Sequence, residues 1–457
     1  MTRGSMSNIA IIVLAAGKGT RMKSSVPKVL HRAAGRSLLA HVLHAAKGLK
    51  PQKTVVIVAP GMEGVAAEAA AIVAGAVIAV QAEPKGTCHA VAMAKEALAG
   101  FSGTVLVLLA DAPLIRPETI AGLSASVSPA VPLAVLGFAA ANPHGYGRII
   151  RNASGDVVAI HEELDASPEE RHITICNSGI IAVSAKTLWA LLPRVGNANA
   201  KGEYYFTDVI ELVAAAGKRA GLALCAESEV AGVNDRIQLA AIEAEFQSRY
   251  RRQNMLNGAT LVAPDTVWFS ADTEIGSDVT IGPHVVFGPG VTVANNVEIN
   301  AFSHLEGATI AAGARIGPYA RLRPGAEIGA NAHIGNFVEI KKAVIGRGAK
   351  ANHLAYIGDA RVGAASNIGA GTITCNYDGY EKHLTDIGEN VFVGSNTALV
   401  APVKIGSGAN IAAGSVITRD VPADALAITR AELQIRQGWA ARYRDIKKAR
   451  KAAKPKA

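Results

Sequence analysis

The sequence predicts two domains of different fold class, a doubly wound α/β domain followed by a parallel β-helix. Up to about Asn234, short apolar runs alternate with alanine-rich helical stretches, the pattern of β-α-β units around a parallel sheet. Residues 236–257 then form a charged segment that favours a helix and has no glycine. From Ile275 onward an apolar residue recurs at every sixth position, which indicates the coils of a β-helix.

Four apolar runs in the first domain are typical of buried strands of a mainly parallel sheet. They are residues 8–15, 53–59, 75–81 and 103–111. Residues 37–49 and 88–98 have the spacing of amphipathic helices between them. In a sheet of this class, ligands bind at the carboxyl ends of the strands.

The six-residue repeat of the second domain occurs in three registers, which chance does not produce. Its apolar positions are Ile275, Ile281, Phe287, Val293, Ile299 and Leu305, then Ile310, Ile316, Leu322, Ile328, Ile334 and Ile340, then Ile387, Val393, Leu399, Ile405, Ile411 and Ile417. We expect these side chains to point into the prism and the glycines after them to turn its corners. The repeat looks interrupted at 346–356 and 369–386, and polar interruptions of a solenoid are candidate sites.

Composition excludes several classes of protein. The chain has 457 residues, half of them apolar, which is enough for about three domains, and no apolar run spans a bilayer. The four cysteines are scattered, which argues against a disulfide framework or a zinc site and fits a reducing cytoplasm. Much of the net charge of +9 lies in the basic tail, so a solvated terminus is a simpler interpretation than nucleic-acid binding, and residues 1–8 predict no packed element.

The loop from Leu14 to Lys28 follows the first strand and has the composition of a phosphate-binding loop. Its spacing matches neither the P-loop nor the dinucleotide-binding glycine pattern. Two glycines and a run of backbone N–H groups still form an anion cradle, and Arg21 and Lys28 add positive charge. Lys18 and Lys23 fit equally well as solvated loop charges.

Several motifs together identify a family resemblance. "LAAGKGTRM…PKVL" resembles the sugar-1-phosphate nucleotidylyltransferases, and the hexapeptide repeat resembles the left-handed β-helix acyltransferases. With "QAEPKGTCHA", "GYGRI", "CNSGI", "GEYYFTD" and "GVND" in order, the chain resembles the bacterial bifunctional N-acetylglucosamine-1-phosphate uridyltransferases/glucosamine-1-phosphate N-acetyltransferases from about Ile9 to Arg430. The resemblance implies a Rossmann-like nucleotidyltransferase domain (1–235), a linker helix (236–257), a left-handed parallel β-helix of hexapeptide repeats (258–430), and a C-terminal helix with a basic tail (431–457).

The resemblance assigns roles in the first domain. Asp111 and Asn234 would bind Mg²⁺, for which carboxylate and amide oxygens are suitable ligands. Arg21 and Lys28 would act in catalysis as a sugar-phosphate oxygen attacks the α-phosphorus of UTP and pyrophosphate leaves. The residues implied to bind UTP and the UDP-sugar are Leu14, Ala15, Ala16, Gly17, Lys28, Gln81, Gly86, Thr87, Gly147, Glu162, Asn177 and Asn234. Glu163 is an alternative to its neighbour Glu162, and Ala110 replaces a glycine usual in the family.

In the second domain the resemblance implies acetyl transfer from acetyl-CoA to glucosamine-1-phosphate. His353, in the family pattern "HLxYxGDA" and in the first interruption of the repeat, would be the general base. Arg323, Lys341, Tyr356 and Asn367 would bind glucosamine-1-phosphate, although Lys341 and Lys342 also fit an exposed pair. The residues implied to contact acetyl-CoA are Ala370, Asn376, Tyr377, Ser395, Ala413 and Arg430.

The sequence therefore predicts a cytoplasmic, homotrimeric enzyme with acetyl-transfer sites between subunits. It would make UDP-N-acetylglucosamine, a precursor of peptidoglycan and lipopolysaccharide, and bind neither nucleic acid nor membrane. One alternative is a monofunctional nucleotidylyltransferase whose β-helix is structural or regulatory, and another is a non-catalytic assembly or sensor protein. His353, the interruptions of the repeat and the long polar loop argue against the first. The candidate ligands Asp111 and Asn234 argue against the second.

Overall fold

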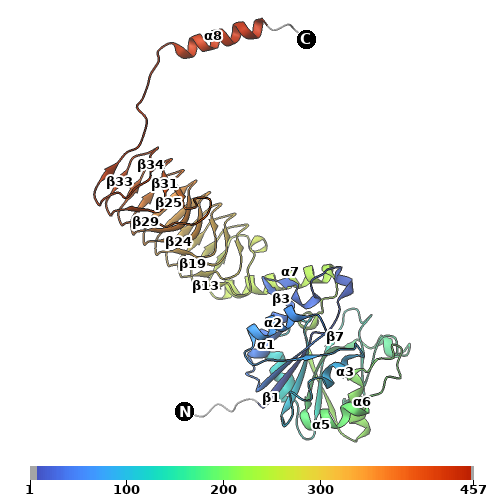
Figure 1. Cartoon of the computed structure of the whole chain (residues 1–457). Helices are drawn as coiled ribbons and strands as arrows, with labels where there is room; N and C mark the ends of the chain where they lie inside the picture. Colours follow the sequence, from blue (N-terminus) through green and yellow to red (C-terminus); the bar gives the residue numbers. More distant parts are fainter. Residues whose placement is uncertain (1–7, 454–457) are drawn as a thin grey trace, which may run out of the picture. The chain divides into compact units, whose positions relative to one another are not determined.

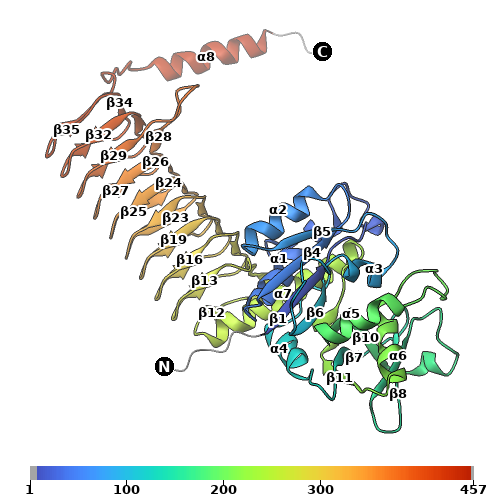
Figure 2. The ribbon, with the colours of Figure 1, turned by 60° about the horizontal axis from the view of Figure 1, so that its bottom comes forward.

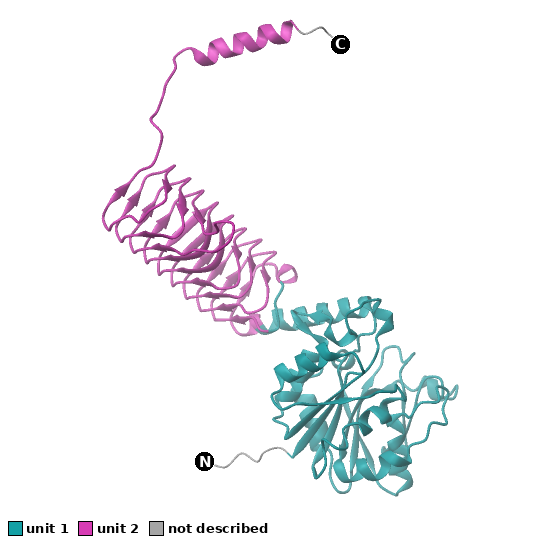
Figure 3. Ribbon diagram, viewed as in Figure 1, with its two compact units in different colours: residues 1–253, 268–271 teal, residues 254–267, 272–457 magenta. Residues whose placement is uncertain are grey.

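The computed structural model describes residues 8–453. The chain divides into two compact units, coloured separately in Figure 3. Unit 1 comprises Met1–Gln253 with Trp268–Ala271, and unit 2 comprises Asn254–Val267 with Asp272–Ala457. The α/β class predicted for the first part and the β-helix predicted for the second are both confirmed (Figure 1).

Unit 1 is built on a nine-stranded sheet of order β5-β4-β1-β6-β10-β7-β11-β9-β8. The strands are β1 (Ile9–Leu14), β4 (Lys53–Val58), β5 (Val77–Val80), β6 (Thr104–Leu109), β7 (Leu133–Ala139), β8 (Arg148–Arg151), β9 (Val157–His161), β10 (Ile175–Ser184) and β11 (Ala220–Cys225). A separate short hairpin is formed by β2 (Arg32–Ala33) and β3 (Arg36–Ser37). The four predicted strands β5, β4, β1 and β6 are mutually parallel (Figure 2).

The sheet is mixed beyond these four strands, because β10 runs antiparallel to both β6 and β7. Helices cover both of its faces and create two cores. The helices of unit 1 are α1 (Leu38–Lys47), α2 (Glu63–Ile72), α3 (Thr87–Ala92), α4 (Pro117–Ala125), α5 (Ala185–Leu191), α6 (Val209–Ala215) and most of α7 (Arg236–Leu256). The helix predicted over 88–98 is too long: α3 ends at Ala92, and tight turns follow, such as Ala94 N–H to the Val91 oxygen at 3.0 Å.

Helix α7 is the charged segment predicted as a helix, and it packs on unit 1 through one side. Phe246 stacks on His41 of α1 with ring centroids 4.1 Å apart. The Gln247 side chain donates to the Phe269 oxygen and accepts from the Phe269 N–H, both at 2.8 Å. These paired bonds attach the segment Trp268–Ala271 to unit 1.

Unit 2 is a parallel β-helix of hexapeptide repeats, left-handed as the resemblance implied. Its strands form a ten-stranded and a fourteen-stranded sheet (Figure 1). The ten-stranded sheet contains β12 (Thr260–Leu261), β14 (Thr280–Ile281), β17 (Glu298–Ile299), β20 (Arg315–Ile316), β23 (His333–Asn336), β25 (Lys350–His353), β27 (Asn367–Ile368), β30 (Phe392–Val393), β33 (Asn410–Ile411) and β35 (Leu426–Ala427).

The fourteen-stranded sheet forms the other faces of the prism. It contains β13 (Glu274–Ile275), β15 (Val286–Phe287), β16 (Thr292–Val293), β18 (His304–Leu305), β19 (Ala308–Ile310), β21 (Arg321–Leu322), β22 (Ala326–Ile328), β24 (Glu339–Ile345), β26 (Tyr356–Val362), β28 (Ile373–Cys375), β29 (Thr385–Ile387), β31 (Ala398–Val400), β32 (Val403–Ile405) and β34 (Val416–Ile417). Of the predicted inward-pointing residues only Ile275 is incompletely buried.

The expectation that glycine turns the corners holds in part: glycine has the left-handed conformation at some corners, such as Gly290 (φ 74°) and Gly317 (φ 84°), but other residues have it elsewhere. A Cβ on Gly282 would lie 2.8 Å from the Ala301 nitrogen of the next coil, so glycine there permits close stacking of the coils. The left-handed backbone conformation occurs two positions after Gly282, at His284 (φ 56°), and at the equivalent position of the next coil, Phe302 (φ 60°).

The first predicted interruption of the repeat is wrong, and the second is shorter than expected. Ala351 lies six residues after Ile345 and six before Ile357, and it is 1% exposed, so the coil is continuous through β25. An alanine fills the position that other coils give to a larger residue. In the second segment β28 keeps its place in the sheet, and the polar loop begins only after Cys375.

Beyond the β-helix, the final helix α8 (Trp439–Ala452) has no buried residue. In the part of the chain that the structure describes, we find no helix that combines the length and the hydrophobicity needed to cross a membrane.

Candidate active sites

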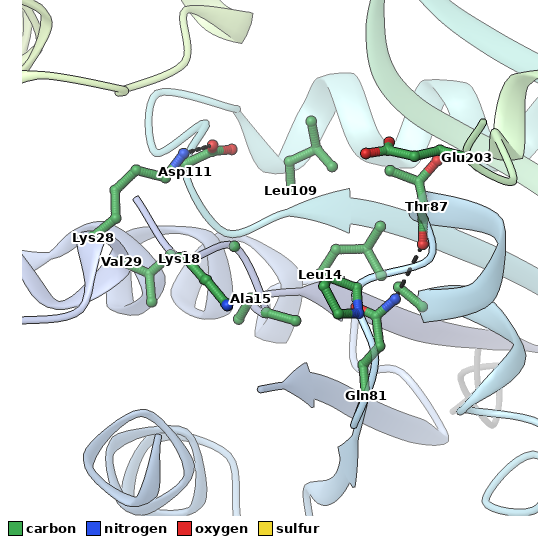
Figure 4. A pocket seen from close by; sticks show the side chains of 15 residues that line it. Leu14, Ala15, Lys18, Lys28, Val29, Gln81, Thr87, Leu109, Asp111 and Glu203 are labelled. Atoms are coloured by element: carbon green, nitrogen blue, oxygen red, sulfur yellow. Dashed lines mark hydrogen bonds and ion pairs between the residues drawn. The ribbon is translucent and has the colours of Figure 1, made fainter. Parts of the chain in front are cut away.

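The carboxyl ends of β1, β5 and β6 surround a pocket of about 320 Å³ in unit 1 (Figure 4). Parallel strands end at the same edge of a sheet, so the loops that follow them converge there. The predicted residues that line this pocket are Leu14, Ala15, Ala16, Gly17, Lys28, Gln81, Gly86, Thr87 and Asp111. Figure 4 shows Lys28 and Asp111 at one side of the pocket and Gln81 with Thr87 at the other.

A second pocket of about 480 Å³ adjoins the first. The predicted residues that line it are Arg21, Asp111, Gly147, Glu162, Asn177 and Asn234. Leu109 and Asp111 line both pockets, so the two cavities meet at the end of β6. The edge of the sheet thus brings together all the residues predicted for the first site.

Two cations and two oxygens meet where the pockets join. The Lys28 ammonium is paired with the Asp111 carboxylate and also lies 3.3 Å from Asn234 Oδ1. Arg21 Nη2 donates to the same Asn234 oxygen at 2.9 Å. Because one ammonium contacts both oxygens, the Asp111 and Asn234 oxygens lie close enough to share one cation. The Lys28 side chain is only 10% exposed, which strengthens its electrostatic interactions.

The far end of the first pocket is shaped by the segment 203–207. A Cβ on Gly86 would lie 2.5 Å from the Tyr204 oxygen, and Gly86 has φ 108°, so only glycine fits there. The Cys88 N–H donates to the Tyr204 oxygen, and the Phe206 N–H donates to Thr87 Oγ1, each at 2.9 Å. These bonds fix the loop that carries Gly86 and Thr87.

The geometry separates the roles of the two adjacent glutamates. Glu163 pairs with the buried Arg148 at 2.7 Å and accepts from the Gly145 N–H at 3.2 Å. Arg148 lowers the pKa of Glu163. Glu162 instead lines the second pocket, and burial raises the pKa of its carboxyl. A Cβ on Gly147 would lie 3.2 Å from Glu162 Oε1, so these two residues form one wall.

Sequence reasoning missed several residues that line these pockets. They are Glu203 in the first and His144, Ser178 and Gln238 in the second. Glu203 lies in the motif "GEYYFTD", so attention to the polar members of that motif could have found it. The other three residues lie close in sequence to Gly147, Asn177 and Asn234, and no motif marked them separately.

In unit 2, four predicted residues form a column along one corner of the prism. Each of them lies two positions after an inward-pointing residue, and these inward-pointing residues are register partners in consecutive coils. The pairs are Ala351 and His353, Ile368 and Ala370, Val393 and Ser395, and Ile411 and Ala413. Hydrogen bonds hold this stack, such as that from the Gly414 N–H to the Ser395 oxygen at 2.8 Å. A Cβ on Gly414 would lie 3.7 Å from Arg430 Cδ, so Arg430 continues the column.

The His353 imidazole is oriented by the coil before it. His353 Nδ1 lies 2.7 Å from Asn336 Oδ1, and the two residues are register partners in β25 and β23. An amide oxygen only accepts, so Nδ1 carries the proton and Nε2 keeps its lone pair. Asn336 was missed in the sequence. It lies 17 residues before His353, which is the length of one coil.

A cationic cluster lies at the next corner. Arg323 and Lys341 follow the register partners Leu322 and Ile340. The neighbouring Lys382, together with desolvation and Arg323, lowers the pKa of Lys341. Lys382 was also missed, because it lies 41 residues after Lys341 in the sequence and only the path of the polar loop brings it to this corner.

The remaining predicted residues lie around these two corners. Gly358 is the register partner of Lys341, and a Cβ on Gly358 would overlap the Tyr356 hydroxyl, so Tyr356 points towards the cationic cluster. Asn376 donates to Asp359. Tyr377 lies in the polar loop, where its hydroxyl donates to the Gly379 oxygen at 2.6 Å. Asn367 starts β27 in the ten-stranded sheet, as the register partner of Lys350 and Phe392.

Within one chain the column and the cluster lie at successive corners of the prism. His353 is followed by a corner and the first residues of β26 before the chain reaches Gly358, the register partner of Lys341.

The fold and these sites define a nucleotidyltransferase joined to a hexapeptide-repeat transferase. Residues 11–149 match the model of the MobA-like NTP transferase domain, and residues 272–307, 307–342 and 385–419 match bacterial transferase hexapeptide repeats. The chain is similar to the "Bifunctional protein GlmU" of Rhodospirillum rubrum, at 57% identity over 96% of this chain and 98% of the relative. The proteins of that name from Azorhizobium caulinodans and Paramagnetospirillum magneticum are each 54% identical, over 96% and 98% of this chain and 97% and 99% of theirs.

The chain belongs to the family of bifunctional GlmU proteins. It is an enzyme with two activities, UDP-N-acetylglucosamine diphosphorylase and glucosamine-1-phosphate N-acetyltransferase. The similarity extends over both units, which argues against the two alternatives weighed from the sequence.

Proposed function

We propose that the two pockets of unit 1 bind UTP and N-acetylglucosamine-1-phosphate, with their phosphates meeting beside Asp111. The observation that supports this most strongly is that Asp111 lines both cavities. The loop Leu14–Gly17 and Gln81 face the nucleoside, whereas Gly147, Glu162 and Asn177 face the sugar. A phosphate oxygen of the sugar attacks the α-phosphorus of UTP and forms a new P–O bond, while the bond from the α-phosphorus to the α,β-bridging oxygen breaks and pyrophosphate departs.

The residues at the junction fit a magnesium ion. Asp111 and Asn234 supply two hard oxygens already close to a shared cation, and Mg²⁺ takes its other ligands from phosphates and water. When bound, the ion adds positive charge at the reacting phosphates. No cluster of three or more His, Cys, Asp or Glu side chains suited to a metal occurs among residues 8–453.

The protein's own groups position the substrates and stabilise charge. The backbone N–H groups of the loop cradle the phosphates of UTP, and Lys28 and Arg21 neutralise the charge that develops on the phosphoryl oxygens. No side chain needs to act as a nucleophile.

In unit 2 we propose that His353 Nε2 accepts the proton of the attacking amine of glucosamine-1-phosphate. A C–N bond forms at the acetyl carbonyl, the C–S bond breaks, and coenzyme A leaves as its thiol. Arg323, Lys341 and Lys382 hold the sugar phosphate, with Tyr356 and Asn367 beside it. Asn376, Tyr377 and the column Ala370–Ser395–Ala413 with Arg430 contact acetyl-CoA.

We propose that the chain forms a homotrimer in which acetyl-transfer sites are shared between subunits. The corner that carries His353 continues into an exposed aromatic column, defined here as His284, Phe302, Tyr319 and Phe337. Its rings stack at 4.9, 4.9 and 5.2 Å, and Phe337 is 55% exposed. A second copy packed on this column would lie beside the corner that carries His353. Sedimentation as a monomer at micromolar concentration would contradict this arrangement.

We propose that acetylation precedes uridylyl transfer and that the enzyme acts in the cytoplasm, where it supplies the precursor of peptidoglycan and lipopolysaccharide. The test supplies glucosamine-1-phosphate, acetyl-CoA, UTP and Mg²⁺ and then omits each in turn. UDP-N-acetylglucosamine should form only with all four, and omission of Mg²⁺ should stop uridylyl transfer but not acetylation. A UDP-sugar without acetylation would contradict the proposal.

A further inference from the structure

The amide of Gln81 in the nucleotide pocket is held from behind by two hydrogen-bond acceptors. Its Nε2 lies 3.1 Å from the Gly86 oxygen and 3.1 Å from His89 Nδ1. A carbonyl oxygen cannot donate, so the group facing Gly86 is the NH₂. Since the same NH₂ faces His89, Nδ1 must present its lone pair, and the His89 proton resides on Nε2.

With both amide hydrogens engaged, Gln81 presents Oε1 to the pocket. Gln81 is 7% exposed, and among the described residues no hydrogen bond to Oε1 is formed. Among residues 8–453, the buried side-chain atoms that lack a hydrogen-bond partner do not include Gln81 Oε1. Since Oε1 has no partner, it must be accessible, and Gln81 lines the cavity. The pocket therefore offers an acceptor at this point.

We propose that His89 is a positioning residue that selects the pyrimidine of the nucleotide by fixing the amide of Gln81. This inference rests on the proposed role of Gln81 against the uracil edge. Uracil presents N3–H, which Oε1 can accept. Cytosine presents a lone pair at N3, which Oε1 repels, whereas a rotated Gln81 amide would donate to it.

His89 Nδ1 and the Gly86 oxygen together keep the rotated amide unfavourable, because rotation would turn Oε1 towards both of these acceptors. The Gly86 oxygen also accepts from the Ala90 N–H at 3.1 Å, so it keeps a donor if Gln81 rotates, but it would then face Oε1 instead of the NH₂ group. His89 Nδ1 has no other hydrogen bond among the described residues, so rotation of Gln81 would leave it without a donor. His89 is half-buried on α3 behind Gln81, does not line the nucleotide pocket, and acts only through the amide.

The test compares kcat/KM for UTP and CTP, with N-acetylglucosamine-1-phosphate as acceptor, in the wild type, His89→Leu and His89→Asn. We expect His89→Leu to lower the UTP/CTP ratio by about tenfold, the equivalent of one net hydrogen bond. The ratio is measured within one enzyme, so partial unfolding cancels. His89→Asn places Oδ1 near the position of Nδ1 and should restore most of the ratio.

An unchanged ratio in His89→Leu would overturn the inference while leaving the proposed function intact. A wild type that used CTP as well as UTP would instead overturn the proposed role of Gln81, on which the inference depends. A ratio that falls equally in His89→Leu and His89→Asn would also contradict the role of an acceptor at this position.

Discussion

The two units assemble their candidate sites in opposite ways. In unit 1, residues of β1, β6 and β10 and of the loops beside β5, β8 and β9 meet in two cavities joined at Asp111. In unit 2, His353 and Lys341 occupy successive corners of one prism. A parallel sheet gathers its loops at one edge, whereas each coil of a solenoid contacts only its neighbours. The comparison teaches that one chain lines both cavities of the first site, whereas we propose that the second site is shared between subunits.

The largest expected effect separates the two activities. Asp111→Ala removes the carboxylate at the junction of the two pockets, and uridylyl transfer should fall at least about a thousandfold. Acetyl transfer in the same preparation should stay within about twofold of wild type and shows that the protein is folded. Equal loss of both activities in folded protein would refute two separate sites. Coupled assays for pyrophosphate and for free thiol measure the two rates.

His353→Ala should produce the reverse pattern. Loss of a general base lowers acetyl transfer by about a hundredfold or more, and uridylyl transfer should not change. Asn336→Ala leaves the base present but unoriented, so its effect should be smaller, about tenfold. A loss in Asn336→Ala as large as that in His353→Ala would show that Asn336 has a direct role.

Arg148→Met tests whether the wall of the sugar pocket depends on a buried ion pair. The Arg148 side chain is 2% exposed, and its loss leaves Glu163 without its partner. We expect unit 1 to lose about 3 kcal/mol of unfolding free energy and the KM for the sugar phosphate to rise. Arg148→Met combined with Glu163→Gln should be less destabilising than the single change. Urea titration monitored by tryptophan fluorescence reports the stability, because Trp189 and Trp268 lie in unit 1.

The smallest effect is a pH dependence confined to unit 1. Burial, then Glu211, Glu162 and Asp165, raise the pKa of Asp208 from 3.8 to about 6. The folded state therefore binds the proton more tightly, and this contribution is complete below pH ~4 and lost as pH rises through ~6. Asp208→Asn should remove that decline and stabilise unit 1 at pH 7.5 by about 1–2 kcal/mol. Unchanged urea midpoints across this range would contradict the shift.

Much of this molecule could be predicted from residue patterns. The period of six located the inward-pointing residues, and the apolar runs located four parallel strands whose ends carry Leu14, Gln81 and Asp111. The first interruption of the repeat was predicted wrongly, because alanine at 351 was not counted as a core residue.

What the sequence could not provide were contacts between distant polar side chains. The pairing of Arg148 with Glu163, the approach of Lys382 to Lys341, and the bond from Gln81 to His89 depend on how loops return to a surface. No periodicity encodes such contacts. The partner of His353 is an exception, because Asn336 lies one coil earlier and the coil length was already evident.

The most direct test of the comparison is complementation between inactive variants. His353→Ala and Lys341→Ala chains are unfolded together, mixed in equal amounts and refolded, and Asp111→Ala is mixed in the same way with Glu162→Ala. A site that takes His353 from one chain and Lys341 from another is intact in about one quarter of random pairings, so acetyl transfer should recover to about a quarter of wild type. Uridylyl transfer should not rise above the mean of its two variants. Recovery of uridylyl transfer, or no recovery of acetyl transfer in correctly assembled mixtures, would contradict the account.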